Sequence, residues 1–337
     1  MKKLTILSLL VLVAFASCKK DKTSTTTTTP PAGPQLKFVF KFDSTQTRYN
    51  SAGVATSVPS ANGAQSPHFN GMSAHYIEMT KNNITAIGAG TVLYTTPTVV
   101  SSAVNISNGS TTATYTDAID FSKESVVGDG QQFFSIPLSQ VTAGTYPYIR
   151  ISVAYQNYDI KYGVLNGTTV NIPGGGVYTY TSNVYANGTI ASFIGYNTYI
   201  SSYKIKTQTD LVNAAKQQGY WSFESAPIGT YTAPYTKGQA PQGATTVVSP
   251  SAFATTAIPP GSCLVTGQFV NQAGTVTPLV ITGNETSDIV ITVSMSTNKS
   301  FEWIRNTNNP NDGCIYPLSG DQVVDMGVRG MVPKLPQ

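Results

Sequence analysis

Apolar and polar residues alternate along several segments of the chain, the pattern expected for strands with one face in a core. It is clearest at residues 36–42, 149–155 and 289–295. The apolar positions of these segments are Leu36, Phe38, Phe40 and Phe42; Ile149, Ile151, Val153 and Tyr155; and Ile289, Ile291, Val293 and Met295. Short strands separated by turn residues predict an all-β fold, an immunoglobulin-like antiparallel β-sandwich over residues 36–335.

Residues from about 166 to 243 differ from their flanks because they are rich in Tyr, Gly and Asn. Asn187-Gly188 between apolar residues predicts a tight hairpin turn. Residues 209–218 predict one short helix, which Thr209 would cap and Gly219 would close. We interpret the region as an insertion on the sandwich, with a second independent domain as the alternative.

The chain begins with Met1-Lys2-Lys3, an apolar stretch and small residues before Cys18. The stretch is shorter than the roughly 20 residues that span a bilayer. The pattern resembles a bacterial lipoprotein signal and predicts a signal peptide over residues 1–17. Cys18 would carry palmitate and other acyl chains and attach the protein to a membrane. Ordinary secretion, which would leave Cys18 as an odd thiol, is the alternative.

Residues 18–35 contain a threonine run and three prolines, with few large apolar residues. Such a segment buries too little surface to offset its ordering entropy, so it predicts a tether. The Lys19-Lys20-Asp21 run resembles the export tag of Bacteroidota surface lipoproteins. We therefore expect an outer-membrane protein on the cell surface, with a periplasm-facing domain as the alternative.

The formal net charge of +4 arises from 20 basic and 16 acidic residues. Five of the basic residues and one acid lie before residue 23, which leaves 15 of each sign in the rest of the chain. The folded part is therefore neutral. Nucleic-acid binding depends on a basic field, so we expect no nucleic-acid partner.

With Cys18 lipidated, Cys263 and Cys314 remain as an even pair. An oxidising compartment favours a disulfide between them, which would stabilise the fold by roughly 4 kcal/mol. Two separate buried thiols are the alternative.

Catalytic motifs are absent from the sequence, and the chain contains only two histidines, so we expect a binding protein rather than an enzyme. His68, Met72 and His75 lie within eight residues, and imidazole with thioether suits copper. These residues are candidate metal ligands. In the alternative interpretation Met72 belongs to the core and each histidine is an ordinary strand or surface residue.

The Tyr-rich region offers a second candidate site, because exposed aromatic side chains suit glycan or protein partners. Tyrosine is also an ordinary strand residue. The aromatic residues considered are Tyr178, Tyr180, Tyr185, Tyr196, Tyr199, Tyr203, Tyr220, Trp221, Tyr231 and Tyr235.

Several segments together carry a family resemblance. They are residues 36–42, 69–79, 136–137 with 144–146, Ser300-Phe301-Glu302-Trp303-Ile304 and 323–330. They resemble Bacteroidota lipoproteins that are similar to the MbnP-like family, whose founding members sit with methanobactin genes and bind copper. The resemblance implies a β-sandwich, periplasmic or surface placement, and copper handling through His and a modified Trp. Trp303 is the tryptophan nearer to a family-like motif, and core packing is its alternative role.

The sequence thus predicts a lipid-anchored β-sandwich binding protein at the outer membrane. Metal handling with copper is one expected function. Recognition of a glycan or protein partner through the Tyr-rich region is the other.

Overall fold

The computed structural model describes residues 33–50, 53–104, 112–172, 176–193, 199–200, 202–211, 220–227, 235–239 and 264–337. The predicted signal peptide, Cys18 and the tether up to residue 32 lie outside these residues. Gly33–Gln337 forms one compact unit. Within the described part, no helix has the length and apolar character needed to cross a membrane.

A four-stranded sheet contains the first strand of the fold and the last one, in the order β23-β20-β1-β7. Its members are β1 (Gln35–Asp43), β7 (Gln132–Pro137), β20 (Ile289–Ser296) and β23 (Met331–Lys334). β1 pairs in parallel with β20 and antiparallel with β7. The two ends of the described chain are therefore built into one sheet.

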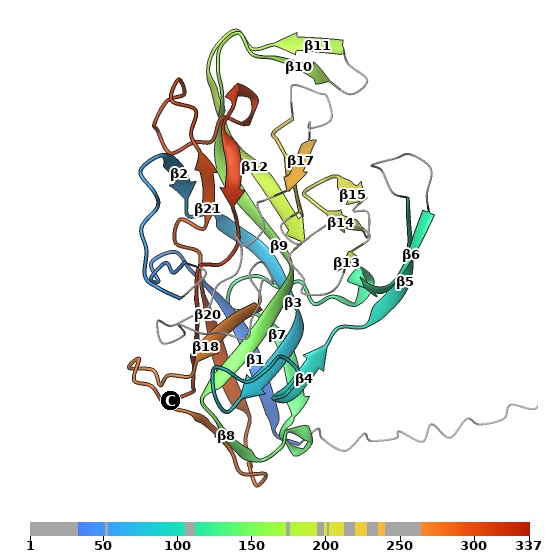
Figure 1. Cartoon of the computed structure of the whole chain (residues 1–337), viewed down its shortest axis with the longest axis vertical. Helices are drawn as coiled ribbons and strands as arrows, with labels where there is room; N and C mark the ends of the chain where they lie inside the picture. Colours follow the sequence, from blue (N-terminus) through green and yellow to red (C-terminus); the bar gives the residue numbers. More distant parts are fainter. Residues whose placement is uncertain are drawn as a thin grey trace, which may run out of the picture. The chain divides into compact units, whose positions relative to one another are not determined.

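A seven-stranded sheet faces it, in the order β17-β16-β12-β9-β3-β4, with β18 paired to β9 as well. Its members are β3 (His68–Thr80), β4 (Thr91–Thr95), β9 (Tyr148–Val164), β12 (Val184–Phe193), β16 (Tyr220–Glu224), β17 (Tyr235–Gln239) and β18 (Leu264–Gln268). β9 is central: β3 lies along one edge, and β12 and β18 share the other. Figure 1 shows β9 as a long central strand, with β12 beside its upper part.

Small sheets and single turns of 3-10 helix complete the fold. The strands are β2 (Asn62–Gln65), β21 (Phe301–Ile304) and β22 (Gln322–Asp325); β5 (Thr98–Val104), β6 (Thr112–Ile119) and β13 (Tyr199–Ile200); β8 (Gly144–Tyr146) and β19 (Leu279–Ile281); β10 (Thr169–Ile172) and β11 (Gly176–Thr179); and β14 (Ser202–Lys204) and β15 (Thr209–Leu211). The 3-10 turns are η1 (Phe121–Lys123), η2 (Leu138–Gln140) and η3 (Pro317–Ser319).

The main core lies between the two large sheets. β1 and β20 contribute alternate residues that are fully buried, as the sequence pattern predicts. Rings from both sheets meet in this core: the centroids of Phe42 on β1 and Phe69 on β3 lie 5.0 Å apart. The prediction of an all-β sandwich is confirmed.

The alternation predicted for residues 149–155 holds only as far as Val153. Ile149, Ile151 and Val153 belong to the main core, whereas Tyr155 belongs to a second cluster. The cause is a β-bulge, since Ser73 pairs with Tyr155 and Ala74 with Val153, which leaves Ala154 as an extra residue on β9. An extra residue shifts the pleat by one position, so the prediction for Tyr155 is wrong.

One prediction for the Tyr-rich region is also wrong, and another is contradicted at its first three residues. Asn187-Gly188 is not a turn, because both residues lie inside β12 and pair with Lys161 and Ile160 of β9. The helix was expected over residues 209–218, but residues 209–211 form the strand β15. Residues 212–219 lie outside the described part. Sheet pairing overrides the local turn and capping signals in both places.

The expected insertion at residues 166–243 is integral to the larger sheet. β12, β16 and β17 all come from it, and β12 pairs with β9 over ten residues. Tyr203 of β14 and Ile205 after it pack into a second, smaller core on the outer face of the same sheet. Its buried members are Ile119, Ala154, Tyr155, Ala191, Tyr203, Ile205 and Tyr220.

Candidate functional site

Three β-bulges interrupt the pairing of β3 with β9, and they leave Asn70, Ala154 and His75 as the extra residues. Bulges are concentrated next to binding and active sites, where they re-aim side chains. Here they accompany a row of polar side chains on the outer face of the larger sheet. Asn70, Asn157 and Asp159 form the centre of this row.

A continuous hydrogen-bond network holds the row in place. The side-chain N–H of Asn70 donates to Asn157 Oδ1 at 2.9 Å and to Asp159 Oδ1 at 3.2 Å. The hydroxyl of Thr189 donates to the same Asp159 Oδ1 at 2.6 Å. Asn157 in turn donates to the Tyr155 hydroxyl at 2.9 Å. Each amide therefore has a fixed orientation.

The row of Asn70, Asn157 and Asp159 forms the floor of a cavity of about 540 Å³, which has a wall on each side. One wall consists of Lys204 at the end of β14 and of Ile205 and Lys206 after it, and the other consists of Phe121 and Val126. A second cavity of about 500 Å³ also has Asp159 in its lining, with His68, Lys161 and Asn187 among its other residues. Because both cavities share Asp159, they adjoin at that residue, and we call the pair the outer groove.

The wall at residues 204–206 is anchored by Glu224 at the end of β16. The buried carboxylate accepts hydrogen bonds from the backbone N–H groups of Lys206, Thr207 and Gln208, at 3.0 to 3.1 Å. Burial acts to raise the pKa of Glu224, but the hydrogen bonds from Thr207 and the backbone outweigh it and lower the pKa. Glu224 is therefore ionised, and its carboxylate holds the wall at residues 204–206 in place.

The outer groove can bind a ligand through many weak polar contacts. Asp159 is half-buried, and among the described residues its Oδ2 accepts no hydrogen bond. Lys204 and Lys206 are exposed and form no ion pair with any described residue. Phe121 is half-buried, and its ring meets that of Tyr155 edge to face at 5.0 Å. The site thus combines an acceptor, cationic donors and an aromatic surface.

The predicted copper ligands occupy different environments on β3. His68 is exposed on the outer face, whereas Met72 is fully buried in the main core, so the sheet does not bring these two together. His75 is buried as the extra residue of a bulge, and its carbonyl accepts a hydrogen bond from Thr96 N–H at 2.7 Å. In the described part, no group of three or more His, Cys, Asp and Glu side chains is arranged to hold a metal ion.

The predicted tyrosine surface is only partly exposed. Tyr203 and Tyr220 are buried, whereas Tyr178 and Tyr185 are 39% and 56% exposed. Tyr180 and Trp221 pack against the main core. Of the remaining candidates, Tyr196 and Tyr231 lie outside the described residues, as do the side chains of Tyr199 and Tyr235.

The predicted disulfide stays a prediction. Cys314 is half-buried and has no disulfide partner among the described residues, and Cys263 lies outside them. Burial raises the pKa of the Cys314 thiol.

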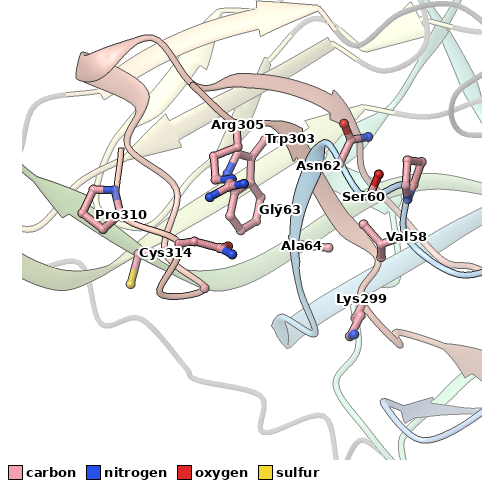
Figure 2. A pocket seen from close by; sticks show the side chains of 13 residues that line it. Val58, Ser60, Asn62, Gly63, Ala64, Lys299, Trp303, Arg305, Pro310 and Cys314 are labelled. Carbon is pink, nitrogen blue, oxygen red and sulfur yellow. The ribbon is translucent and has the colours of Figure 1, made fainter. Parts of the chain in front are cut away.

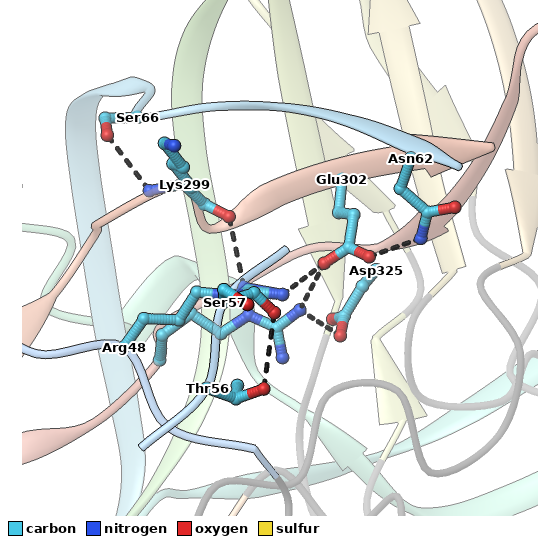
Figure 3. A network of polar contacts seen from close by, with 9 residues as sticks. Arg48, Thr56, Ser57, Asn62, Ser66, Lys299, Glu302 and Asp325 are labelled. Atoms are coloured by element: carbon cyan, nitrogen blue, oxygen red, sulfur yellow. Dashed lines mark hydrogen bonds and ion pairs between the residues drawn. The ribbon is translucent and has the colours of Figure 1, made fainter. Parts of the chain in front are cut away.

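A third cavity, of about 240 Å³, lies where β2 pairs with β21, and Trp303, Lys299, Arg305 and Asn62 are among its lining residues (Figure 2). Glu302, which precedes Trp303 in β21, contacts Arg48 (Figure 3) and also Arg329, and all three residues are buried. Arg329 also pairs with Asp325. This buried ion cluster contains two positive and two negative groups.

The sequence analysis did not identify Asn70, Asn157 or Asp159. The sequence of β9 contains a signal. Its core residues have odd numbers up to Val153 and even numbers from Tyr158 onward, so the apolar alternation changes phase between these two residues. Such a phase change indicates a bulge, and it points to Asn157 inside that interval, but not to Asp159 after it or to Asn70 on β3.

No protein-family model matches the chain, and neither a curated protein nor a solved structure matches it.

Proposed function

We propose that this protein is a lipid-anchored surface protein that binds a saccharide in the outer groove. The observation that carries the proposal is the hydrogen-bonded row of Asn70, Asn157 and Asp159 on the floor of a cavity of about 540 Å³. Side chains whose orientation is fixed before binding lose little entropy when a ligand arrives.

The chemistry of the groove suits a ligand with many hydroxyl groups. Each sugar hydroxyl both donates and accepts, so it pairs with carboxylate acceptors such as Asp159 Oδ2 and with lysine donors. The ring of Phe121 offers the apolar face of a sugar a flat partner. The recognition role expected for the Tyr-rich region is thereby assigned to residues of β3, β9 and the 204–206 wall rather than to its tyrosines.

The attachment at Cys18 and the outer-membrane placement remain part of the proposal and rest on the lipoprotein-like signal. Copper handling rests on the family resemblance, and the positions of His68 and Met72 on opposite faces do not favour it. Titration of the purified protein with copper(I) and copper(II) would test it separately.

The proposal is tested by screening a panel of neutral and acidic oligosaccharides against the purified protein by calorimetry. We expect at least one member to bind, and Asp159→Asn to weaken its affinity by about tenfold, because a hydrogen bond to a charged group is lost. Asp288→Asn makes the same change in a carboxylate remote from the groove and is the control.

Binding that Asp159→Asn leaves unchanged would contradict the proposed site. If no saccharide of the panel binds the wild-type protein, the proposed function fails. Circular dichroism of both variants shows whether they fold as the wild type does.

A further inference from the structure

The cavity of about 240 Å³ where β2 pairs with β21 has an unusual set of charges. Its lining contains Lys299 and Arg305 and no Asp or Glu. The other three arginines of the chain, Arg48, Arg150 and Arg329, each contact a carboxylate. Arg305 and Lys299 form no ion pair with any residue that the structure describes. Both charges of this cavity thus lack a counterion from the described part of the protein.

The same cavity is lined by a buried donor without an acceptor. Trp303 is 1% exposed, and its indole Nε1–H donates to no described residue. A buried donor left in this state keeps its desolvation cost without a compensating hydrogen bond, and most buried polar groups in proteins have a partner. A ligand acceptor in the cavity would remove the cost.

Close packing fixes the position of the indole. Trp303 pairs with Gly63 of β2, and a Cβ built on Gly63 would lie 2.4 Å from the ring and 2.7 Å from Nε1. Only glycine leaves room for the ring at this place. Figure 2 shows Trp303, Arg305 and Gly63 among the residues that line the cavity.

The buried ion cluster holds other parts of the lining. Glu302 accepts a hydrogen bond from the side-chain amide of Asn62. Arg48 donates to the backbone carbonyl of Lys299 at 3.2 Å, and Lys299 N–H donates to the Ser66 hydroxyl at 2.9 Å (Figure 3). Asn62 and the backbone of Lys299 are therefore positioned before any ligand arrives.

We propose that this cavity binds a phosphate or sulfate group, either as the free anion or as the terminal ester of a larger molecule. Arg305 supplies the planar fork that matches two oxygens of such a group, Lys299 supplies a point charge, and Trp303 supplies one N–H. A volume of about 240 Å³ accommodates the group and a few attached atoms. The proposal is independent of saccharide binding in the outer groove.

The two tryptophans of the chain make the test specific. In a ¹⁵N-labelled sample each gives one indole N–H resonance, and Trp221→Phe identifies which belongs to Trp303. We expect inorganic phosphate or sulfate to shift the Trp303 resonance saturably at millimolar concentration and to leave that of Trp221 in place. Titration with a sugar phosphate and a sugar sulfate then distinguishes the free anion from an ester by its affinity.

Variants test whether anion binding depends on Arg305 and Lys299 in the cavity or only on the positive charge of the protein in general. Arg305→Gln and Lys299→Gln should each weaken binding by about tenfold, because a charge-assisted hydrogen bond is removed. Lys81→Gln removes an exposed charge outside the cavity lining and should leave the affinity unchanged. An unshifted Trp303 resonance with every anion, or equal weakening by Lys81→Gln and Arg305→Gln, would overturn the proposal.

Discussion

At the scale of single residues, Gly188 shows how a local signal can mislead. Asn-Gly is the strongest short hairpin signal, yet Gly188 lies within β12. A Cβ on Gly188 would lie 2.3 Å from the ring of Phe223 on the neighbouring strand. The position needs glycine because another side chain occupies the space, and not because a turn needs a positive φ.

Gly188→Ala should lower the free energy of unfolding by about 1–3 kcal/mol, the usual cost of overpacking a core. Chemical denaturation measures the change. Gly128→Ala is the matched control, since its Cβ would have no neighbour nearer than 3.6 Å. Equal stability of the two variants would show that Phe223 can move aside.

Asp325 in the buried ion cluster predicts a pH dependence. Burial raises its pKa to about 7, although Arg329 beside it acts in the opposite direction. The unfolded chain releases this proton near pH 4, so the folded state binds more protons between about pH 4 and about pH 7. The contribution of Asp325 to stability is therefore largest at low pH and declines as the pH rises through that window.

Asp325→Asn removes this titration. The unfolding free energy of the wild type minus that of the variant should fall between about pH 4 and about pH 7, by up to about 1.4 kcal/mol per pH unit. Denaturation curves across this range measure it. A difference that stays constant with pH would show that Arg329 keeps the carboxylate ionised in the folded state.

At the scale of elements, the groove depends on three strands and a loop that are held in different ways. The floor is built on β3, β9 and β12, and sheet pairing holds these strands on either side of the bulge at Asn70. The wall that follows β14 depends on Glu224, which binds three successive backbone N–H groups. Floor and wall should therefore respond differently to loss of this carboxylate.

Glu224→Ala should speed hydrogen exchange at Lys206, Thr207 and Gln208, and it should weaken ligand binding in the groove. We expect a loss of at least about 1.5 kcal/mol of stability, since one or more hydrogen bonds to a charged group disappear. Exchange measured by mass spectrometry locates the effect. Glu285→Ala removes a carboxylate that also accepts backbone N–H bonds, but in a surface turn, and serves as the control. Unchanged exchange at 206–208 would refute the bracing role.

At the scale of the whole molecule, the proposed lipid attachment and the fold depend on separate parts of the chain. Residues before the first strand carry the lipoprotein-like signal, while Gly33–Gln337 forms a unit by its own contacts. Loss of the anchor should therefore leave the fold intact.

Cys18→Ser should move the protein from the membrane fraction to the soluble fraction, because lipid attachment requires the thiol. Its thermal unfolding should match that of the wild-type domain within error. Fractionation followed by immunoblotting measures the distribution. Membrane retention of the variant would mean that the chain is held there by something other than a lipid on Cys18.

The sequence by itself determined the all-β class and the inward faces of β1 and β20, because burial of one face of a strand imposes a period of two along the chain. It failed at Tyr155 and Gly188, where an extra residue and a neighbouring ring override the local pattern. The tertiary structure alone brought together Asn70 with Asp159, and residues 299–305 with Asn62 and Gly63 of β2. Such sites combine residues that sheet pairing and loop packing bring together from distant segments, and no local pattern records which segments will meet.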